Sequence, residues 1–197
     1  MKKYLIFFVL ILFISCSKNK WDNTTIAILP MGLDSNRYYL IDEMKSSIEE
    51  NPDFKVIILK EVDLPKSAWY QPRKRYKADK ILKHLKAIKP DSVDYILAFT
   101  SADISVNKNG NKDWGIFGLG FEPGKASVVS TFRLGKNKRQ LNRRVLKITK
   151  HELGHNFGLH HCKNSKTCVM NSAEGSIKTV DRVSNIFCKK CKEKLRK

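Results

Sequence analysis

Three histidines and one glutamate are spaced as a catalytic metal centre requires. His151 and His155 lie four residues apart, so on a helix their imidazoles project from one face and can bind one metal ion. Glu152 points away from that axis and can reach a water at the metal rather than the metal itself. Gly158 can adopt the left-handed conformation that ends a helix, which brings His161 back as a third ligand. Three protein ligands leave the fourth position open, as in a catalytic rather than a structural zinc site.

The pattern from His151 to His161 is H-E-x-x-H-x-x-G-x-x-H, the metzincin form of the zinc-protease signature. The H-E-x-x-H core alone occurs by chance in unrelated helices, but Gly158 and His161 at the required offsets make the pattern specific. His160 is the neighbouring alternative for the third ligand. The spacing favours His161, and we expect His160 to face solvent or the substrate side.

Four cysteines follow the histidines in two pairs, and the second pair is a C-x-x-C. They are Cys162, Cys168, Cys188 and Cys191. Four thiolates fit a tetrahedral zinc site with no open position, which would be structural. Outside the cytoplasm the same cysteines could instead form two disulfides, but their spacing after a zinc motif favours the metal. Met170 lies two residues after Cys168, and a methionine downstream of the third histidine is what a Met-turn beneath the ligands requires.

These motifs together resemble the archaemetzincin family of zinc metallopeptidases. The resemblance covers residues 25–191, and upstream it rests on residues 26–32, 73–76, 117–118 and 130–134. In one departure, five residues separate Cys162 from Cys168 where the family has four, and we expect the extra residue to bulge from a loop. The resemblance implies two zinc ions per chain, one catalytic and one structural. We expect a zinc-activated water to hydrolyse peptide bonds of a peptide or protein substrate, with Glu152 as general base.

The first residues resemble a bacterial lipoprotein signal. A basic head at residues 1–3 precedes an uncharged stretch, residues 4–14, that is too short to span a membrane comfortably. Ser15 then precedes Cys16, which would be acylated, although Phe13 stands where a leucine is usual. We therefore expect a signal peptide at 1–15, a lipidated cysteine and tether at 16–23, and one peptidase domain at 24–197. The lipid would hold the domain in the cell envelope. The alternatives are an ordinary secretory signal and an uncleaved anchor, and with either of them the domain would also lie outside the cytoplasm.

The chain carries a formal net charge of +19, which would suit nucleic acid, an anionic membrane surface or acidic substrates. The lysines are spread along the sequence and no nucleic-acid-binding motif accompanies them, so we expect solvated lysines, no specific nucleic-acid partner and a monomer. The lipid would be the contact with the membrane. The alternative function is a non-catalytic, lipid-anchored protein that binds peptides or polyanions.

Hydrophobic periodicity predicts an α/β fold. The resemblance implies its α+β metzincin form, with a twisted mixed sheet and an antiparallel edge strand. We expect strands at residues 25–29, 54–59, 95–100, 115–121 and 126–132, and helices at 37–50 and 74–88. Residues 107–113 are expected to form a surface turn, and residues 136–144 a basic loop that enters the active-site helix. The short C-terminal subdomain is polar and would be stapled by the cysteine zinc site.

Residues 115–120 are the candidate edge strand for substrate binding. In metzincins such a strand runs antiparallel to the substrate and binds it through main-chain hydrogen bonds, and the resemblance implies the same here. Glycines at 115, 118 and 120 suit a strand that another backbone approaches closely. Asp103, which follows the strand at 95–100, is expected to brace a loop near the cleft.

Overall fold

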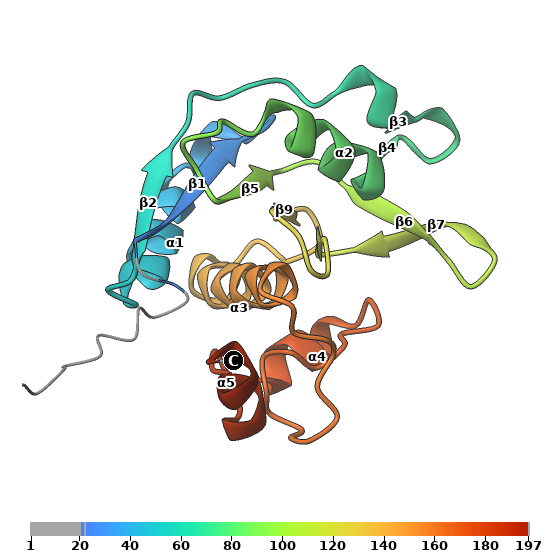
Figure 1. Ribbon diagram of the computed structural model, residues 1–197. Helices are drawn as coiled ribbons and strands as arrows, with labels where there is room; N and C mark the ends of the chain where they lie inside the picture. Colours follow the sequence, from blue (N-terminus) through green and yellow to red (C-terminus); the bar gives the residue numbers. More distant parts are fainter. Residues whose placement is uncertain (1–20, 22, 197) are drawn as a thin grey trace, which may run out of the picture.

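The computed structural model describes residues 21 and 23–196 (Figure 1). The expected signal peptide, the lipidated Cys16 and most of the tether lie outside these residues. Within the described part of the chain, no helix is both long and apolar enough to span a membrane.

The main sheet has five strands and an antiparallel edge, as predicted. Its order is β2-β1-β5-β9-β8, in which β8 is antiparallel to β9 and the other neighbours are parallel. The strands are β1 (Thr24–Pro30), β2 (Phe54–Ile58), β5 (Tyr95–Thr100), β8 (Gly118–Gly120) and β9 (Ala126–Ser130). Because β8 is the last strand of the order, one side of its backbone pairs with no further strand in the described part of the chain.

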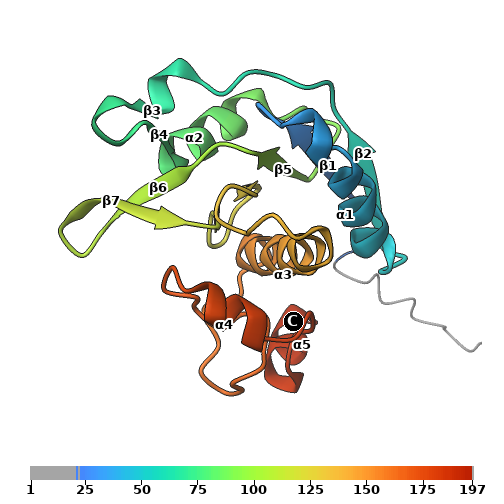
Figure 2. The same ribbon diagram turned by 180° about the vertical axis from the view of Figure 1, so that it is seen from behind.

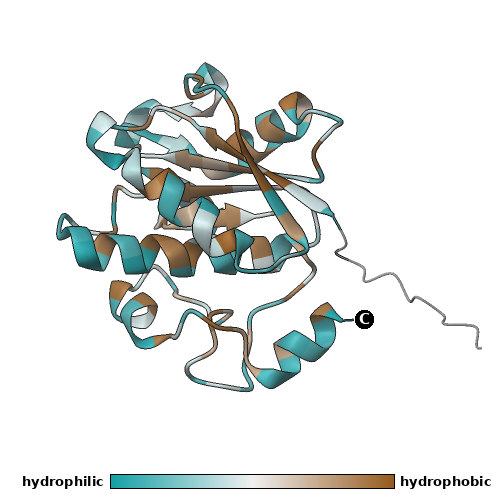
Figure 3. Ribbon diagram, turned by 90° about the vertical axis from the view of Figure 1, so that its left-hand side faces the viewer, coloured by the Kyte–Doolittle hydropathy of each residue, from teal (hydrophilic) through white to brown (hydrophobic). Residues whose placement is uncertain are grey.

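Helices cover both faces of this sheet, which explains why its central strands β1, β5 and β9 are buried along almost their whole length, whereas β2 at the sheet edge is only partly buried. Helices α1 (Tyr39–Glu49) and α3 (Lys138–Asn156) pack on one face, and α2 (Ala78–Ile88) packs on the other (Figures 1 and 2). In β5, Leu97 and Phe99 belong to the first core and Ile96 to the second. Alternate side chains of a strand point to opposite faces, so a strand buried on both sides has no polar alternation. Figure 3 shows the resulting hydrophobic sheet between helices with hydrophilic outer faces.

A second, four-stranded sheet was not predicted. Its order is β3-β4-β6-β7, and its strands are β3 (Trp69–Tyr70), β4 (Arg75–Lys77), β6 (Ile104–Lys108) and β7 (Asn111–Ile116). Short 3-10 helices at Ser35–Arg37, Lys66–Ala68 and Gln71–Arg73 complete the N-terminal part. The predicted helix at 74–88 begins only at Ala78, because the three preceding residues pair with β3 and β6.

The β6–β7 hairpin corrects two further expectations. Residues 107–113 are no surface turn: the chain reverses at Asn109 and Gly110, which both have positive φ, and pairs on either side of them. The predicted edge strand at 115–120 is divided between two sheets, since residues 115–116 belong to β7 and residues 118–120 to β8. The predicted hairpin between β8 and β9 is present.

Helix α3 is longer than predicted, because the basic residues at its start belong to the helix and not to a loop. Asn137 caps it by accepting a hydrogen bond from the backbone N–H of Gln140 at 3.1 Å. Leu141 and Val145 are buried against the core, whereas Arg139 and Arg143 lie on the exposed side. The helix therefore runs from the cap to the histidines without interruption.

The C-terminal subdomain lies beneath α3 in Figures 1 and 2 and contains two short helices, α4 (Ile177–Arg182) and α5 (Lys189–Leu195). A third apolar cluster, formed by Leu159, Val169 and Met170 with three of the cysteines, is its core. This core is small, as the polar sequence indicated.

Candidate metal centre and cleft

Helix α3 and the turn after it bring the three histidines together. His151 and His155 lie one turn apart on α3, with their Nε2 atoms 3.1 Å apart. Gly158 has φ +90°, which turns the chain so that His161 faces the other two rings. One nitrogen of each imidazole lies within 4.8 Å of the others, so the three can share one metal ion.

Backbone carbonyls determine which nitrogens are available. His151 Nδ1 lies 2.8 Å from the carbonyl oxygen of Val169, and His155 Nδ1 lies 2.8 Å from that of Leu159. A carbonyl only accepts hydrogen bonds, so each Nδ1 carries the proton and each Nε2 presents a lone pair. Two lone pairs that face each other repel unless a cation lies between them. Burial also lowers the pKa of His151 to about 3 and that of His155 to about 4, which keeps both rings in the neutral form that binds metals.

His160, the alternative third ligand, lies outside this group. Its side chain is exposed and pairs with the carboxylate of Glu122. The other oxygen of that carboxylate lies 2.6 Å from His155 Nδ1, so Glu122 borders the cluster on the side of His155. Sequence reasoning did not single out Glu122, because nothing in its spacing relates it to the histidines.

Glu152 lies beneath the edge strand and is 5% exposed. A Cβ atom on Gly118 would lie 2.6 Å from Glu152 Oε1, so β8 passes directly over the carboxylate and only glycine fits there. Burial raises the pKa of Glu152 to about 8, although a backbone hydrogen bond from Gly120 lowers it. A cation held by the histidines would favour the ionised form, since an opposite charge nearby lowers a carboxyl pKa.

Met170, the residue for which a Met-turn was expected, packs against α3 at Gly154, next to His155 in the sequence. Its side chain is fully buried, and a Cβ atom on Gly154 of α3 would lie 2.5 Å from its Sδ atom. The preceding residue, Val169, supplies the carbonyl that holds His151. The turn at residues 169–170 therefore packs on α3 and orients one of the rings, and the role of Met170 as a Met-turn stays a prediction.

The histidines line a cleft of about 270 Å³. Strands β7 and β8 form one wall, α3 forms the floor, and residues 171–175 with α4 form the opposite wall. Trp114, Lys108 and Glu174 stand at the same end as His161. Burial lowers the pKa of His161, whereas the charge of Glu174 raises it and that of Lys108 lowers it.

The four cysteines converge in the C-terminal subdomain and are free thiols. Cys162 Sγ and Cys188 Sγ are 3.6 Å apart, and Cys168 Sγ and Cys191 Sγ are 3.8 Å apart. Zinc–sulfur bonds of about 2.3 Å in a tetrahedron separate the sulfurs by about 3.8 Å. The two-disulfide alternative is therefore not the arrangement found, and the cysteines can hold a metal ion. The extra residue at 163–167 is accommodated in the loop without separating the sulfurs.

The surroundings of these thiols also suit a cation. Burial would raise the pKa of Cys162, but the backbone N–H of Asn164, which lies 3.4 Å from its sulfur, and neighbouring thiols lower it to about 7. Burial raises the pKa of Cys168 and Cys191. Four sulfurs so close together, three of them in buried residues, become thiolates together only if a cation compensates their charge.

Comparison with known protein families matches residues 24–197 to peptidase family M54. The chain belongs to this family. It is 33% identical to the archaemetzincin of Archaeoglobus fulgidus over 172 residues, which are 87% of this chain and 98% of that protein. It is 34% identical to the archaemetzincin of Methanopyrus kandleri over 159 residues, which are 80% of this chain and 87% of that protein.

Solved structures of these relatives have the same fold. The crystal structure of the Methanopyrus kandleri archaemetzincin aligns with a TM-score of 0.77 at 31% identity, covering 91% of this chain and 96% of that one. The Archaeoglobus fulgidus archaemetzincin, crystallised with malonate, aligns with a TM-score of 0.73 at 28% identity, covering 87% of this chain and 99% of that one. This M54 chain is therefore a metallopeptidase of the archaemetzincin kind, and the zinc dependence of the family agrees with its histidine and cysteine groups.

Proposed function

We propose that this M54 peptidase hydrolyses peptide bonds at the histidine cluster, with a zinc ion held by His151, His155 and His161. The proposal rests on the Nε2 atoms of His151 and His155, which lie 3.1 Å apart. Backbone carbonyls hold the Nδ1 atoms of both rings, so the two Nε2 lone pairs are directed toward the same point. A zinc ion there would act as a Lewis acid and make water a nucleophile near neutral pH.

Glu152 is the general base of this proposal. Its carboxylate lies in the floor of the cleft under Gly118, where a peptide on β8 would pass. Glu152 takes the proton of the attacking water on its carboxylate and later gives it to the leaving amine. Its burial supports this role, because a base that is kept out of bulk water has a pKa closer to neutrality.

The free edge of β8 would bind the substrate backbone. A peptide that adds to this edge as a further strand gains main-chain hydrogen bonds independently of its sequence. As in the metzincins that the chain resembles, we propose that the peptide runs antiparallel to β8. Its scissile bond would then lie beside the strand, next to the histidine cluster and Glu152.

Two zinc ions per chain belong to the same proposal, the second one being structural and held by Cys162, Cys168, Cys188 and Cys191. The test is cleavage of a peptide library by the purified protein, with and without a chelator, together with zinc counting. We expect cleavage that a chelator abolishes and zinc restores, and two zinc ions per chain. Metal-loaded protein that binds peptides without cleaving them would favour the non-catalytic alternative.

We also propose that residues 1–15 are a lipoprotein signal and that Cys16 is acylated, which places the peptidase in the cell envelope, outside the cytoplasm. The support is the sequence alone: a basic head, a short apolar stretch and a small residue before the cysteine. Labelling with a radioactive fatty acid tests it. We expect label on the wild type and none on Cys16→Ala, and equal labelling of both would contradict the proposal.

A further inference from the structure

The β6–β7 hairpin reaches across the end of the cleft beside His161. Lys108, the last residue of β6, has its Nζ atom 2.5 Å from Glu174 Oε2 and 5.7 Å from the centre of the Trp114 ring. On the opposite wall, Gly175 lies so close that a Cβ atom would be 3.3 Å from Trp114 Nε1. The hairpin and residues 172–175 therefore meet over this end of the cleft.

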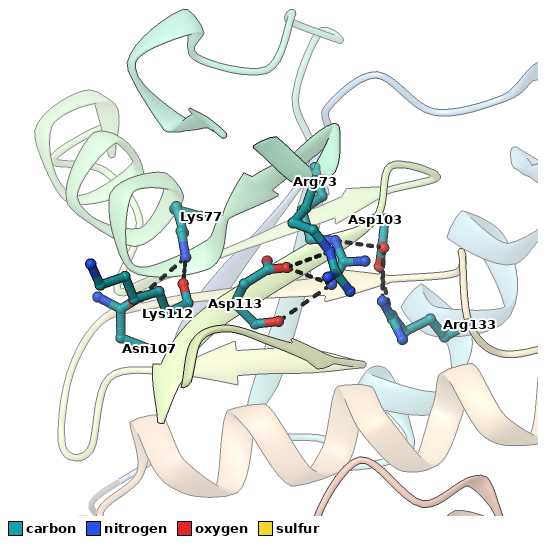
Figure 4. Close-up of polar contacts among 8 residues, drawn as sticks. Arg73, Lys77, Asp103, Asn107, Lys112, Asp113 and Arg133 are labelled. Atoms are coloured by element: carbon teal, nitrogen blue, oxygen red, sulfur yellow. Dashed lines mark hydrogen bonds and ion pairs between the residues drawn. The ribbon is translucent and has the colours of Figure 1, made fainter. Parts of the chain in front are cut away.

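The base of the hairpin is firmly held, as Figure 4 shows. Asp103, which is 9% exposed, accepts hydrogen bonds from Arg133 Nε at 2.6 Å and Nη2 at 2.8 Å, and it pairs with Arg75 at 3.2 Å. Asp113 of β7 pairs with Arg73 at 3.1 Å and with Arg75 at 3.4 Å. Bidentate pairs with buried carboxylates fix geometry well. Lys108 and Trp114 thus project from a rigid arm.

A second set of contacts holds the hairpin nearer its tip. Lys77, the last residue of β4, is buried, and its ammonium group donates to Asn107 Oδ1 at 3.1 Å and to the carbonyl oxygen of Lys112 (Figure 4). These two acceptors come from the two strands of the hairpin. The arm is therefore tied to the rest of the molecule on both of its strands.

The partner of Lys108 is far less constrained. The side chain of Glu174 is 64% exposed, and besides Lys108 only the hydroxyl of Ser172, at 2.7 Å, holds it among the described contacts. Exposed ion pairs contribute little to stability. Another carboxylate can therefore take the place of Glu174 on Lys108 at little cost.

The other lysine that lines the cleft cannot serve in this way. Lys147 donates to the carbonyl oxygens of Val180 at 3.0 Å and Asp181 at 3.1 Å, so its ammonium group is already engaged with the backbone. In the described lining of the cleft, Lys108 is thus the cation that a substrate carboxylate can reach by replacing one exposed side chain.

We propose that Lys108 binds a carboxylate of the substrate on the C-terminal side of the cleaved bond, in place of Glu174. The inference rests on the proposed function. The chain runs from Lys108 through β7 into β8, so a peptide antiparallel to β8 directs its C-terminal residues back past Trp114 toward Lys108. The ring of Trp114 offers an apolar surface for the neighbouring side chain. The preferred substrates are then peptides with an acidic residue, or a free carboxyl terminus, just after the cleaved bond.

The test compares matched peptides on the Glu152→Ala variant, so that binding is measured without turnover. One pair of peptides differs by Glu against Gln on the C-terminal side, and a second pair differs by a free carboxyl terminus against an amide. Fluorescence anisotropy should show about 5-fold tighter binding of the carboxylate member of one pair, and which pair responds distinguishes the two sources. Equal binding within both pairs would overturn the inference.

Variants at Lys108 assign the effect. Added to Glu152→Ala, Lys108→Met should abolish the preference and Lys108→Arg should retain it, whereas Glu174→Gln should increase carboxylate binding because it removes the internal competitor. Lys83→Met, on the exposed face of α2, is the matched control and should leave the preference unchanged. A preference that survives Lys108→Met would overturn the inference.

The two proposals fail in distinguishable ways. If the wild-type protein cleaves peptides without regard to Lys108 or to carboxylates, the proposed function stands and the inference falls. If no peptide is cleaved but the Lys108-dependent binding preference holds, the carboxylate site stands and the hydrolytic assignment falls.

Discussion

At the scale of single residues, two carbonyl oxygens determine what the histidines can do. The carbonyls of Val169 and Leu159 take the Nδ1 protons of His151 and His155, so both Nε2 atoms are left to bind a metal. This detail could not be predicted, because neither carbonyl has a side-chain signature. The convergence of the rings could be predicted, since helical spacing and one glycine are enough to require it.

Gly154 lets the turn at Met170 lie against α3. Alanine is the better helix former by about 1 kcal/mol, but its Cβ atom would lie 2.5 Å from the buried sulfur of Met170. We expect Gly154→Ala to lower the free energy of unfolding by about 1–3 kcal/mol, because overpacking outweighs helix propensity. Urea denaturation measures the change. Met170→Ala removes the clashing sulfur, so adding Gly154→Ala to that variant should lower the free energy of unfolding by less than it does in the wild type. Strictly additive changes in the free energy of unfolding would contradict this explanation.

At the scale of elements, the buried strands were predictable and the second sheet was not. Strands β1, β5 and β9 are largely apolar because both of their faces are covered, and such runs are visible in a sequence. Strand β4 has only three residues, and the tip of the β6–β7 hairpin is polar like a loop. Neither segment therefore shows the alternation of polar and apolar residues that marks a strand. The signal for the hairpin was the Asn109-Gly110 dipeptide, whose residues both adopt the positive φ that a tight hairpin turn demands.

Two bidentate arginine–aspartate pairs differ in burial and should differ in their effect on stability. Asp103, 9% exposed, pairs with Arg133, and Asp181, 48% exposed, pairs with Arg144. We expect Asp103→Ala to lower the free energy of unfolding by about 2–4 kcal/mol, because it leaves arginines without their buried partner. Asp181→Ala is the control and should lower it by less than about 1 kcal/mol. Equal effects in chemical denaturation would show that the hairpin base is not held as described.

At the scale of the whole molecule, the C-terminal subdomain depends on its cysteines. We expect Cys188→Ser to lose one bound zinc ion and to make residues after Gly158 sensitive to protease, because little apolar core remains to hold them. Ile186→Ser, at an exposed position in the same segment, is the control. It should keep the zinc content and the protease resistance of the wild type. Unchanged zinc content in Cys188→Ser would contradict a four-cysteine site.

The described chain begins far from the end of the cleft at Lys108. Trp21, the first described residue, packs its ring against Phe54 of β2. Strand β2 lies at the opposite end of the molecule from the β6–β7 hairpin (Figures 1 and 2). An N-terminal tether would therefore leave the end of the cleft at Lys108 accessible to peptides.

The central claim is that Glu152 and a zinc ion on three histidines hydrolyse peptides. Its most direct test is the cleavage rate of Glu152→Ala relative to wild type at equal zinc content per chain. The rate should fall by about 10²–10⁴-fold, because the proton of the attacking water loses its acceptor. A variant that keeps its zinc and cleaves as fast as wild type would contradict the account.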